Sequence, residues 1–176
     1  MKRRPHSRSA SLEHELKTLQ AKNTELTRLL RSLDEARSTL ADHYDFAPIG
    51  FVTLDEKGCV REINLTTARI LCRERNHLLG MPFLPHVQKS DCEVFLAHLR
   101  QCRKSRGKVI SDMSLRTGRT GTVPVEMRSV PVIDPHSGAT VYRTAITDIT
   151  ERLRARDALR RSEERYRAVV DRYAFR

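Results

Sequence analysis

Leucine occupies every seventh position between residues 11 and 44 of this chain, from Leu12 to Leu40. The stretch contains no glycine or proline, so it is expected to form one long α-helix. Its apolar stripe is narrow, as in the a and d positions of a two-stranded coiled coil. The alternative is a single helix packed on its own domain, but such helices carry a wider apolar face. We predict a parallel homodimeric coiled coil over residues 11–44, with a seam of Leu12, Leu16, Leu19, Asn23, Leu26, Leu30, Leu33 and Leu40.

The polar Asn23 falls on an a position, where asparagine lowers stability but favours a two-stranded register. A leucine repeat behind a basic start also occurs in basic-zipper DNA-binding proteins, whose basic helix runs unbroken into the zipper. Here Pro5 interrupts the few basic residues, and residues 1–10 are expected to be a flexible basic segment. The net charge of +11 is spread along the chain. It favours nonspecific attraction to polyanions, and we predict no specific nucleic-acid partner.

Residues 45–150 have the pattern of one α+β domain. Short apolar runs bounded by glycine, proline and asparagine are typical of strands and tight turns. Asn64 is placed to cap a short helix, and Ser90 or Asp91 to begin a longer one. The order of two strands, small helices and three strands predicts an antiparallel sheet with helices on one face. The expected strands are residues 50–54, 59–63, 109–116, 123–133 and 140–149, and the longer helix spans residues 91–104.

The last expected strand runs without a loop into a charged helix over residues 151–176. Asp148 and Glu151 have the spacing of a capping box, in which an N-cap side chain and a carboxylate three residues later satisfy backbone NH groups. A strand joined to a helix in this way would move the helix whenever the strand moves. We therefore predict a signalling junction at Asp148, Thr150 and Glu151. The helix is too polar to be stable alone and needs a partner.

Several motifs resemble the PAS domain, in the sensory-box form of bacterial sensor histidine kinases and diguanylate cyclases. They follow one another in the family's order over residues 44–150 and the next helix. One departure is Cys72, at a position where relatives often carry glycine. The motifs are YDFAPIGFVTLDEKGCVREIN, the N-x-x-x-A spacing of Asn64 and Ala68, LLGMPF, PVEMRSVPV, and DITER followed by RSEERYRAVV.

The resemblance implies a PAS fold, with a five-stranded antiparallel sheet and helices that enclose a small cavity. Such domains sense a ligand, cofactor or partner and pass the change to flanking helices. Strand alternation and the inner face of the long helix indicate which side chains would line the cavity, or would simply pack as a core. These are Phe51, Ile63, Phe95, Leu99, Met113, Leu115, Val125, Met127, Thr144 and Ile146.

Nothing in the sequence identifies a cofactor. The residues ILCRERNHLL lack the asparagine–cysteine pair and glutamine of the flavin-binding members, and Ile146 stands where a flavin-contacting glutamine is expected. In haem-binding members a histidine of the long helix is the axial ligand. His98 is the candidate here, and it lies about 60° around the helix from Phe95, at the edge of the apolar face. His86 is a weaker candidate, and the expectation is no ligand or a small apolar one.

No nucleophile motif, phosphate-binding loop or output domain is present, so the chain is expected not to be an enzyme. The four cysteines form no C-x-x-C pair, which argues against a structural metal or a disulfide framework. No apolar run approaches the roughly 20 residues that span a bilayer, and a cytoplasmic location is expected.

We predict a dimeric sensory module of signal transduction, as in two-component systems, that acts on a histidine kinase, a cyclase or a regulator. The alternative is a ligand-free interaction module that serves as an adaptor for a kinase or transcription regulator.

Overall fold

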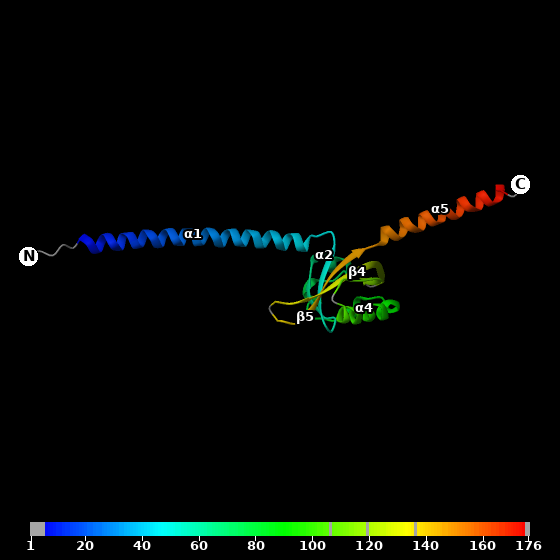
Figure 1. Ribbon diagram of the computed structural model, residues 1–176, viewed down its shortest axis with the longest axis horizontal. Coiled ribbons are helices and arrows are strands. Elements are labelled where there is room, and N and C mark those ends of the chain that lie inside the picture. The colour runs from blue at the N-terminus through cyan, green and yellow to red at the C-terminus, as the bar shows by residue number, and fades with distance from the viewer. Residues whose placement is uncertain (1–5, 106, 119, 136, 175–176) are drawn as a thin grey trace, which may run out of the picture. The chain divides into compact units, whose positions relative to one another are not determined.

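The structure, a computed structural model, describes the backbone of residues 6–174 except residues 106, 119 and 136. Side chains are described for residues 14–167 with the same exceptions. Contacts between residues divide the chain into two units, residues 1–44 and residues 45–176 (Figure 1). We describe each unit by itself.

The first unit consists of the long helix α1, His6–Asp45, whose last residue already belongs to the second unit. The predicted helix over residues 11–44 is therefore confirmed. It begins earlier than predicted, because residues 6–10, which were expected to be flexible, already have helical backbone.

The second unit is built on one antiparallel sheet, which confirms the predicted α+β fold. Its strands lie in the order β2-β1-β5-β4-β3. The strand that follows α1 and the strand that precedes α5 are thus hydrogen-bonded neighbours at the centre of the sheet, with Gly50 opposite Ile146. The strands are β1 Gly50–Asp55, β2 Val60–Ile63, β3 Val109–Thr117, β4 Gly121–Ile133 and β5 Thr140–Asp148.

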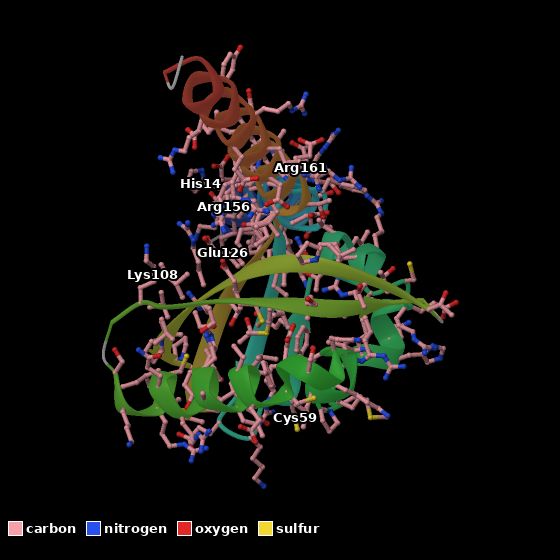
Figure 2. All side chains as sticks on the ribbon, turned by 90° about the vertical axis from the view of Figure 1, so that its right-hand side faces the viewer. His14, Cys59, Lys108, Glu126, Arg156 and Arg161 are labelled. Atoms are coloured by element: carbon pink, nitrogen blue, oxygen red, sulfur yellow. The ribbon has the colours of Figure 1, made fainter. Side chains whose placement is uncertain are left out.

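Short helices and one longer helix cover one face of this sheet. The longer helix α4, Cys92–Lys104, buries Phe95, Leu99 and Cys102, as its 3.6-residue periodicity predicts. Figure 2 shows α4 lying along one side of the sheet. The other helices of the described chain are α2 Leu65–Ile70, α3 Arg75–Leu78, two short 3₁₀ helices at Leu84–His86 and Lys89–Asp91, and α5 Thr150–Ala174.

Gly50 allows α2 to lie close to the sheet. A Cβ atom at this position would come within 2.6 Å of the Thr67 Oγ1 and 3.3 Å of the Ile146 Cβ. Any larger residue would therefore push α2 away from the central strand pair. Among the described helices, none is both long enough and apolar enough to cross a membrane.

Candidate functional site

Helix α5 begins directly at the end of strand β5. The Oδ1 of Asp148, the last residue of β5, accepts a hydrogen bond from the Thr150 NH at 2.8 Å. The carbonyl of Ile149 accepts the first helical hydrogen bond, from the Leu153 NH at 2.9 Å. Ile149 is only 4% exposed, and its own NH donates to the Pro124 carbonyl on β4 at 3.0 Å. One buried residue, attached to the neighbouring strand, therefore joins strand to helix.

This arrangement differs in detail from the predicted capping box. The Asp148 carboxylate caps the helix through Thr150, the first helical residue, whereas the box would use the NH of Glu151. Glu151 is exposed. The helix also begins at Thr150, one residue before its predicted start. A role of Asp148, Thr150 and Glu151 in signalling stays a prediction.

Arg152, in the first turn of α5, attaches the helix to two further strands. Its guanidinium donates to the Glu126 Oε2 on β4 at 3.0 Å and lies 3.5 Å from the Asp112 Oδ2 on β3. Glu126 is 8% exposed and also accepts a hydrogen bond from Arg128. The bonds from Arg128 and from Arg152 hold the pKa of the Glu126 carboxyl below its usual range. Figure 2 places Glu126 on the side of the sheet opposite α4.

Sequence reasoning missed Arg152, Glu126 and Asp112. Arg152 ends the DITER motif, but the sequence does not show which of the many arginines of this helix meets the sheet. The pairing of β3 with β4 brings Asp112 opposite Glu126. The pairing of β4 with β5 brings Glu126 opposite Thr147. A glutamate in the middle of an apolar strand was the only signal available before that register was known.

At the same end of the sheet, where β1 begins beside the end of β5, Asn64 connects α2 to the start of β1. Its Oδ1 accepts hydrogen bonds from the Thr67 NH at 3.0 Å and the Phe51 NH at 2.8 Å. Its Nδ2 donates to the Ile49 carbonyl at 3.0 Å, and the residue is 0% exposed. The predicted N-cap is therefore confirmed, and the same side chain also holds the segment that enters the sheet.

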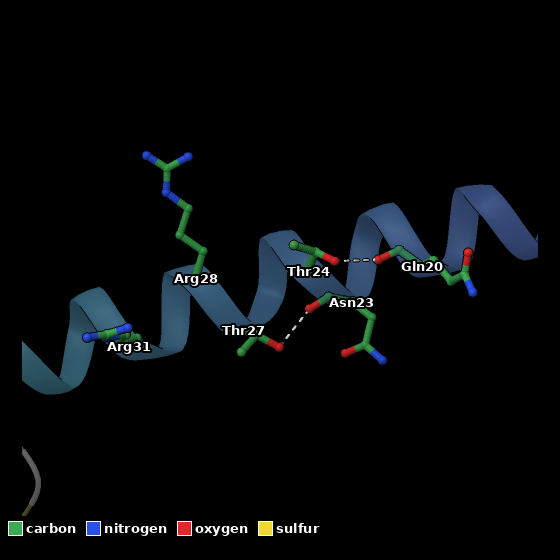
Figure 3. Close-up of a pocket in the computed structure, with 6 residues that line it drawn as sticks. All are labelled: Gln20, Asn23, Thr24, Thr27, Arg28 and Arg31. Carbon is green, nitrogen blue, oxygen red and sulfur yellow. Dashed lines mark hydrogen bonds between the residues drawn. The ribbon is translucent and has the colours of Figure 1, made fainter.

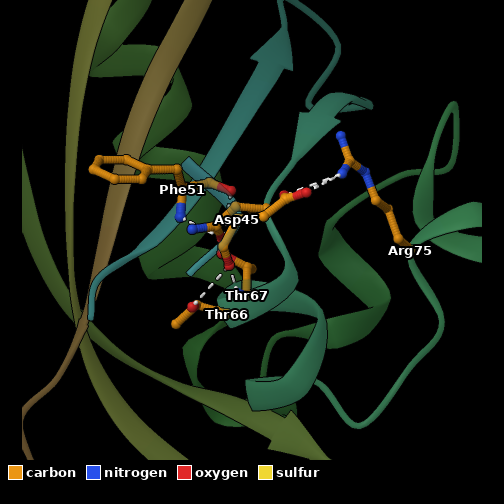
Figure 4. Close-up of polar contacts among 6 residues, drawn as sticks. Asp45, Phe51, Thr66, Thr67 and Arg75 are labelled. Atoms are coloured by element: carbon orange, nitrogen blue, oxygen red, sulfur yellow. Dashed lines mark hydrogen bonds and ion pairs between the residues drawn. The ribbon is translucent and has the colours of Figure 1, made fainter. Parts of the chain in front are cut away.

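An ion pair holds the residue where α1 ends. The Nη1 of Arg75 lies 3.0 and 3.1 Å from the two carboxylate oxygens of Asp45 (Figure 4). Nearby, the Thr66 hydroxyl donates to the Ala47 carbonyl at 2.7 Å. Both of the residues at which the flanking helices meet the domain, Asp45 and Asp148, are thus fixed by hydrogen bonds.

The expected pocket residues lie on the helix-covered face, with one exception. Phe51 pairs with Ala145, whereas Val52 pairs with Thr144, so Phe51 points to the opposite face and its assignment was wrong. In β1 the residues that face the helices are Gly50, Val52 and Leu54. The sequence pattern did not show that this series starts at Gly50. The structure brings the others together at 0% to 6% exposure: Ile63, Phe95, Leu99, Met113, Leu115, Val125, Met127, Thr144 and Ile146. Whether they line a ligand cavity stays a prediction.

His98 lies inside this core. The helix geometry alone had placed it at the edge of the apolar face. It is 1% exposed, and its Nδ1 and Nε2 lie 2.9 Å and 2.7 Å from the hydroxyls of Ser111 and Ser129. An axial haem ligand directs one ring nitrogen at the iron, and here both nitrogens already face hydroxyl groups. This arrangement does not fit haem ligation. His86 is half-buried, and burial together with Arg73 and Arg116 lowers its pKa.

The seam of α1 presents leucine to solvent. The exposed fraction is 57% at Leu26, 65% at Leu33 and 69% at Leu40. Leu16, Leu19 and Leu30 are likewise more than half exposed, whereas the side chain of Leu12 lies outside the described residues. Figure 3 shows this part of α1 around Asn23. The Thr24 hydroxyl donates to the Gln20 carbonyl, and the Thr27 hydroxyl donates to the Asn23 carbonyl.

The described residues offer little other chemistry. Among them, no group of three histidine, cysteine or acidic side chains could hold a metal ion. The cysteines Cys59, Cys72, Cys92 and Cys102 are all free thiols. Burial raises the pKa of the Cys102 thiol, so it stays protonated at neutral pH.

Comparison with known proteins agrees with this geometry. The family model described as the PAS fold matches residues 35–149. The PAS domain of an HTR-like protein from Haloarcula marismortui has a TM-score of 0.61 at 19% identity, covering 70% of this chain and 99% of its own. No curated protein shows significant similarity to the chain.

Two further solved structures are PAS domains of signalling proteins. One belongs to a two-component sensor histidine kinase, with a TM-score of 0.54 at 16% identity over 65% of this chain and 97% of that one. The other belongs to the nitrogen regulation protein NR(II) from Vibrio parahaemolyticus, with a TM-score of 0.52 at 11% identity over 62% and 96%. Since the family match spans most of the second unit and the sheet has the expected strands, this chain belongs to the PAS family.

Proposed function

We propose that this chain is a sensory module of signal transduction, in which two copies pair through α1 and a change in the domain core is passed to α5. The similarity to PAS domains of a sensor histidine kinase and a nitrogen regulation protein supports a signalling role. A histidine kinase, a cyclase or a regulator would be the protein that receives the change.

The attachment of α5 to the sheet is the observation that carries this proposal. Asp148 and Ile149 fix the first turn of α5 to β5 and β4, and Arg152 reaches Glu126 on β4 and Asp112 on β3. A rigid helix held by three strands follows their relative movement, because its first turn cannot relax separately from them. A change of sheet twist caused inside the core would therefore turn or tilt α5.

The exposed leucines support pairing of two chains through α1. Each buried leucine side chain contributes about 1.5–3 kcal/mol relative to an exposed one, so a long row of solvent-exposed leucines is unfavourable in a lone helix. A second copy would present the same stripe in the same register. The polar Asn23 would then sit between the two helices and favour the two-stranded state.

Charge reversal at the sheet–helix contact tests the transmission step. We expect Arg152→Glu and Glu126→Arg each to increase amide hydrogen exchange in residues 150–158, because each variant places like charges side by side. The double variant Arg152→Glu/Glu126→Arg should recover part of the protection. Arg154→Glu, on the exposed side of the same turn, is the matched control. Unchanged protection in both single variants would rule out Arg152 as the connection.

The alternative, a ligand-free interaction module, is favoured by the packing of the core. The helix-covered face is filled by side chains that are at most 6% exposed, and His98 finds its partners within the protein. In that case the partner itself would be the signal. Native mass spectrometry separates the two functions, because a sensor of small molecules should retain one per chain, whereas an adaptor should show the mass of the bare polypeptide.

A further inference from the structure

A chain of hydrogen-bonding groups crosses the core from α4 to β5. His98 on α4 contacts Ser111 on β3 and Ser129 on β4, and the Ser129 Oγ lies 2.7 Å from the Thr144 Oγ1 on β5. The Thr144 hydroxyl lies 3.4 Å from the Tyr142 carbonyl. His98 and Ser129 are 1% exposed and Thr144 is 2% exposed, so bulk water cannot substitute for Ser129 or Thr144.

The direction of these hydrogen bonds depends on the proton count of the imidazole. A neutral ring donates from one nitrogen and accepts at the other, whereas a protonated ring donates from both. With the neutral ring protonated at Nδ1, Ser129 can donate to Nε2 and accept from Thr144. With the protonated ring, Ser129 must accept from His98 and donate to Thr144. The Thr144 hydroxyl must then donate to the Tyr142 carbonyl, which lies 3.4 Å away.

We propose that His98, Ser111, Ser129 and Thr144 form a proton-sensing element, in which protonation of His98 reverses the hydrogen bonds to β5 and loosens α4 from the sheet. This inference rests on the proposed function, since it names the proton as the stimulus. Proton sensing requires no bound small molecule. It also explains why polar side chains lie in a core that could otherwise be apolar.

The groups packed around His98 favour the neutral ring, since burial lowers its pKa. On α4 the titratable residue that shares the buried face with His98 is Cys102, one turn further along and itself within hydrogen-bonding reach of Ser129. On β5 the inward-facing titratable group is the Tyr142 phenol, whose buried hydroxyl has no hydrogen-bond partner among the described residues. The inward-facing neighbours of Ser111 and Ser129 on β3 and β4 include Met113 and Met127, which carry no charge.

Among the described residues, no carboxylate is near enough to compensate a charged imidazole in the core. The acidic residues Asp112 and Glu126 alternate with the inward residues and point to the other face. Burial alone lowers the pKa of His98. A proton on this ring would place an uncompensated cation between α4 and the sheet, and such a charge is relieved by opening the contact.

The element is connected to the outgoing helix by covalent continuity. Thr144 lies on β5, and the same strand ends at Asp148, whose carboxylate caps α5. A change in the Ser129–Thr144 contact therefore acts on the strand that enters the signalling junction.

Nuclear magnetic resonance of the full chain between about pH 8 and about pH 5 tests the proposal, since free histidine titrates in this range. The ring signals of His98 should titrate at lower pH than a free histidine, because burial lowers its pKa, and amides of β5 should lose exchange protection over the same interval. His98→Gln should remove this loss at β5, because glutamine can bond both hydroxyls but takes up no proton. His77→Gln is the matched control and should leave the loss unchanged.

Thr144→Val supplies a second variant that keeps the side-chain shape. It removes the acceptor that Ser129 needs when His98 is protonated, so the titration of His98 should move to still lower pH. The proposal is overturned if His98 stays neutral until the whole domain unfolds, if Thr144→Val leaves the titration in place, or if folded His98→Gln retains the loss of protection at β5.

The experiment also separates this inference from the proposed function. If β5 responds to His98 while residues 150–158 of α5 do not, proton sensing stands and transmission to α5 fails. If reversal of the Arg152–Glu126 charges still governs α5 while His98 does not titrate, transmission stands and proton sensing fails.

Discussion

The Oδ1 of Asn64 accepts a hydrogen bond from the Phe51 NH at 2.8 Å, so the residue that caps α2 is also bonded to strand β1. Replacement by alanine would leave the buried NH groups of Phe51 and Thr67 and the Ile49 carbonyl without this partner. We expect Asn64→Ala to reduce the free energy of unfolding by about 2–4 kcal/mol, because a lost cap and unmet buried groups both contribute.

Urea denaturation measures this loss, and Asn76→Ala is the matched control. Asn76 is exposed, and its replacement should change the free energy of unfolding by no more than about 0.5 kcal/mol. Equal midpoints for the two variants would show that Asn64 does not connect α2 to the sheet.

Stability should depend on pH through Glu126. Arg128 and Arg152 hold the pKa of this carboxyl below its ordinary value of 4.5 in the folded protein, so the unfolded chain takes up a proton first as the solution is acidified. The contribution of Glu126 is therefore present above the unfolded-state pKa and is lost as pH falls through the folded-state pKa. The stability difference between the unmodified protein and Glu126→Gln should shrink between about pH 6 and about pH 3.

Urea denaturation at several pH values checks this expectation, with Glu25→Gln on α1 as the matched substitution. If Glu126→Gln and Glu25→Gln behaved alike over the acidic range, the two arginines would not be holding the Glu126 carboxylate ionised.

Cys72 has a left-handed backbone conformation, with φ of +51°. This conformation costs an L-residue about 1–2 kcal/mol, part of which glycine recovers despite its greater freedom in the unfolded chain. We expect Cys72→Gly to raise the free energy of unfolding by about 0.5–1 kcal/mol. The same conformational cost accounts for the glycine that relatives often carry at this position.

The matched control for this change is Cys92→Gly. Cys92 has a right-handed helical φ of −57°, so glycine there should lower stability, by up to about 1 kcal/mol. Thermal or urea unfolding would detect the opposite signs, and a loss of stability in both variants would mean that the strain at Cys72 is compensated by its side-chain contact with Thr117.

Pairing through α1 predicts a change of mass when its seam is charged. Leu26→Asp combined with Leu33→Asp should convert a dimer to a monomer in analytical ultracentrifugation, because carboxylates at d positions would face each other. Arg28→Asp combined with Glu35→Asp changes the net charge by the same amount outside the seam and should leave the dimer intact. A dimer that survives the seam variant would have to be held together elsewhere.

The heptad repeat of α1, the strand pattern and the Asn64 cap could all be predicted from the residues, because each depends on neighbours close in the chain. The same local pattern was insufficient at Phe51. Strand alternation has a period of two, so an error of one position in where β1 begins its inward side moves a side chain to the opposite face.

The contacts that most concern function depend on residues far apart in the sequence. Arg152 meets Glu126 only because β4 lies beside β5 in one register, and His98 is buried only because α4 crosses Ser111 and Ser129. Periodicity shows which face of a helix or strand is apolar. It does not show which polar side chain of another element packs against that face. The sequence alone therefore determined the helices, the strands and the PAS fold, whereas tertiary packing decided which charged and polar side chains find partners, because those energies exist only once distant segments meet.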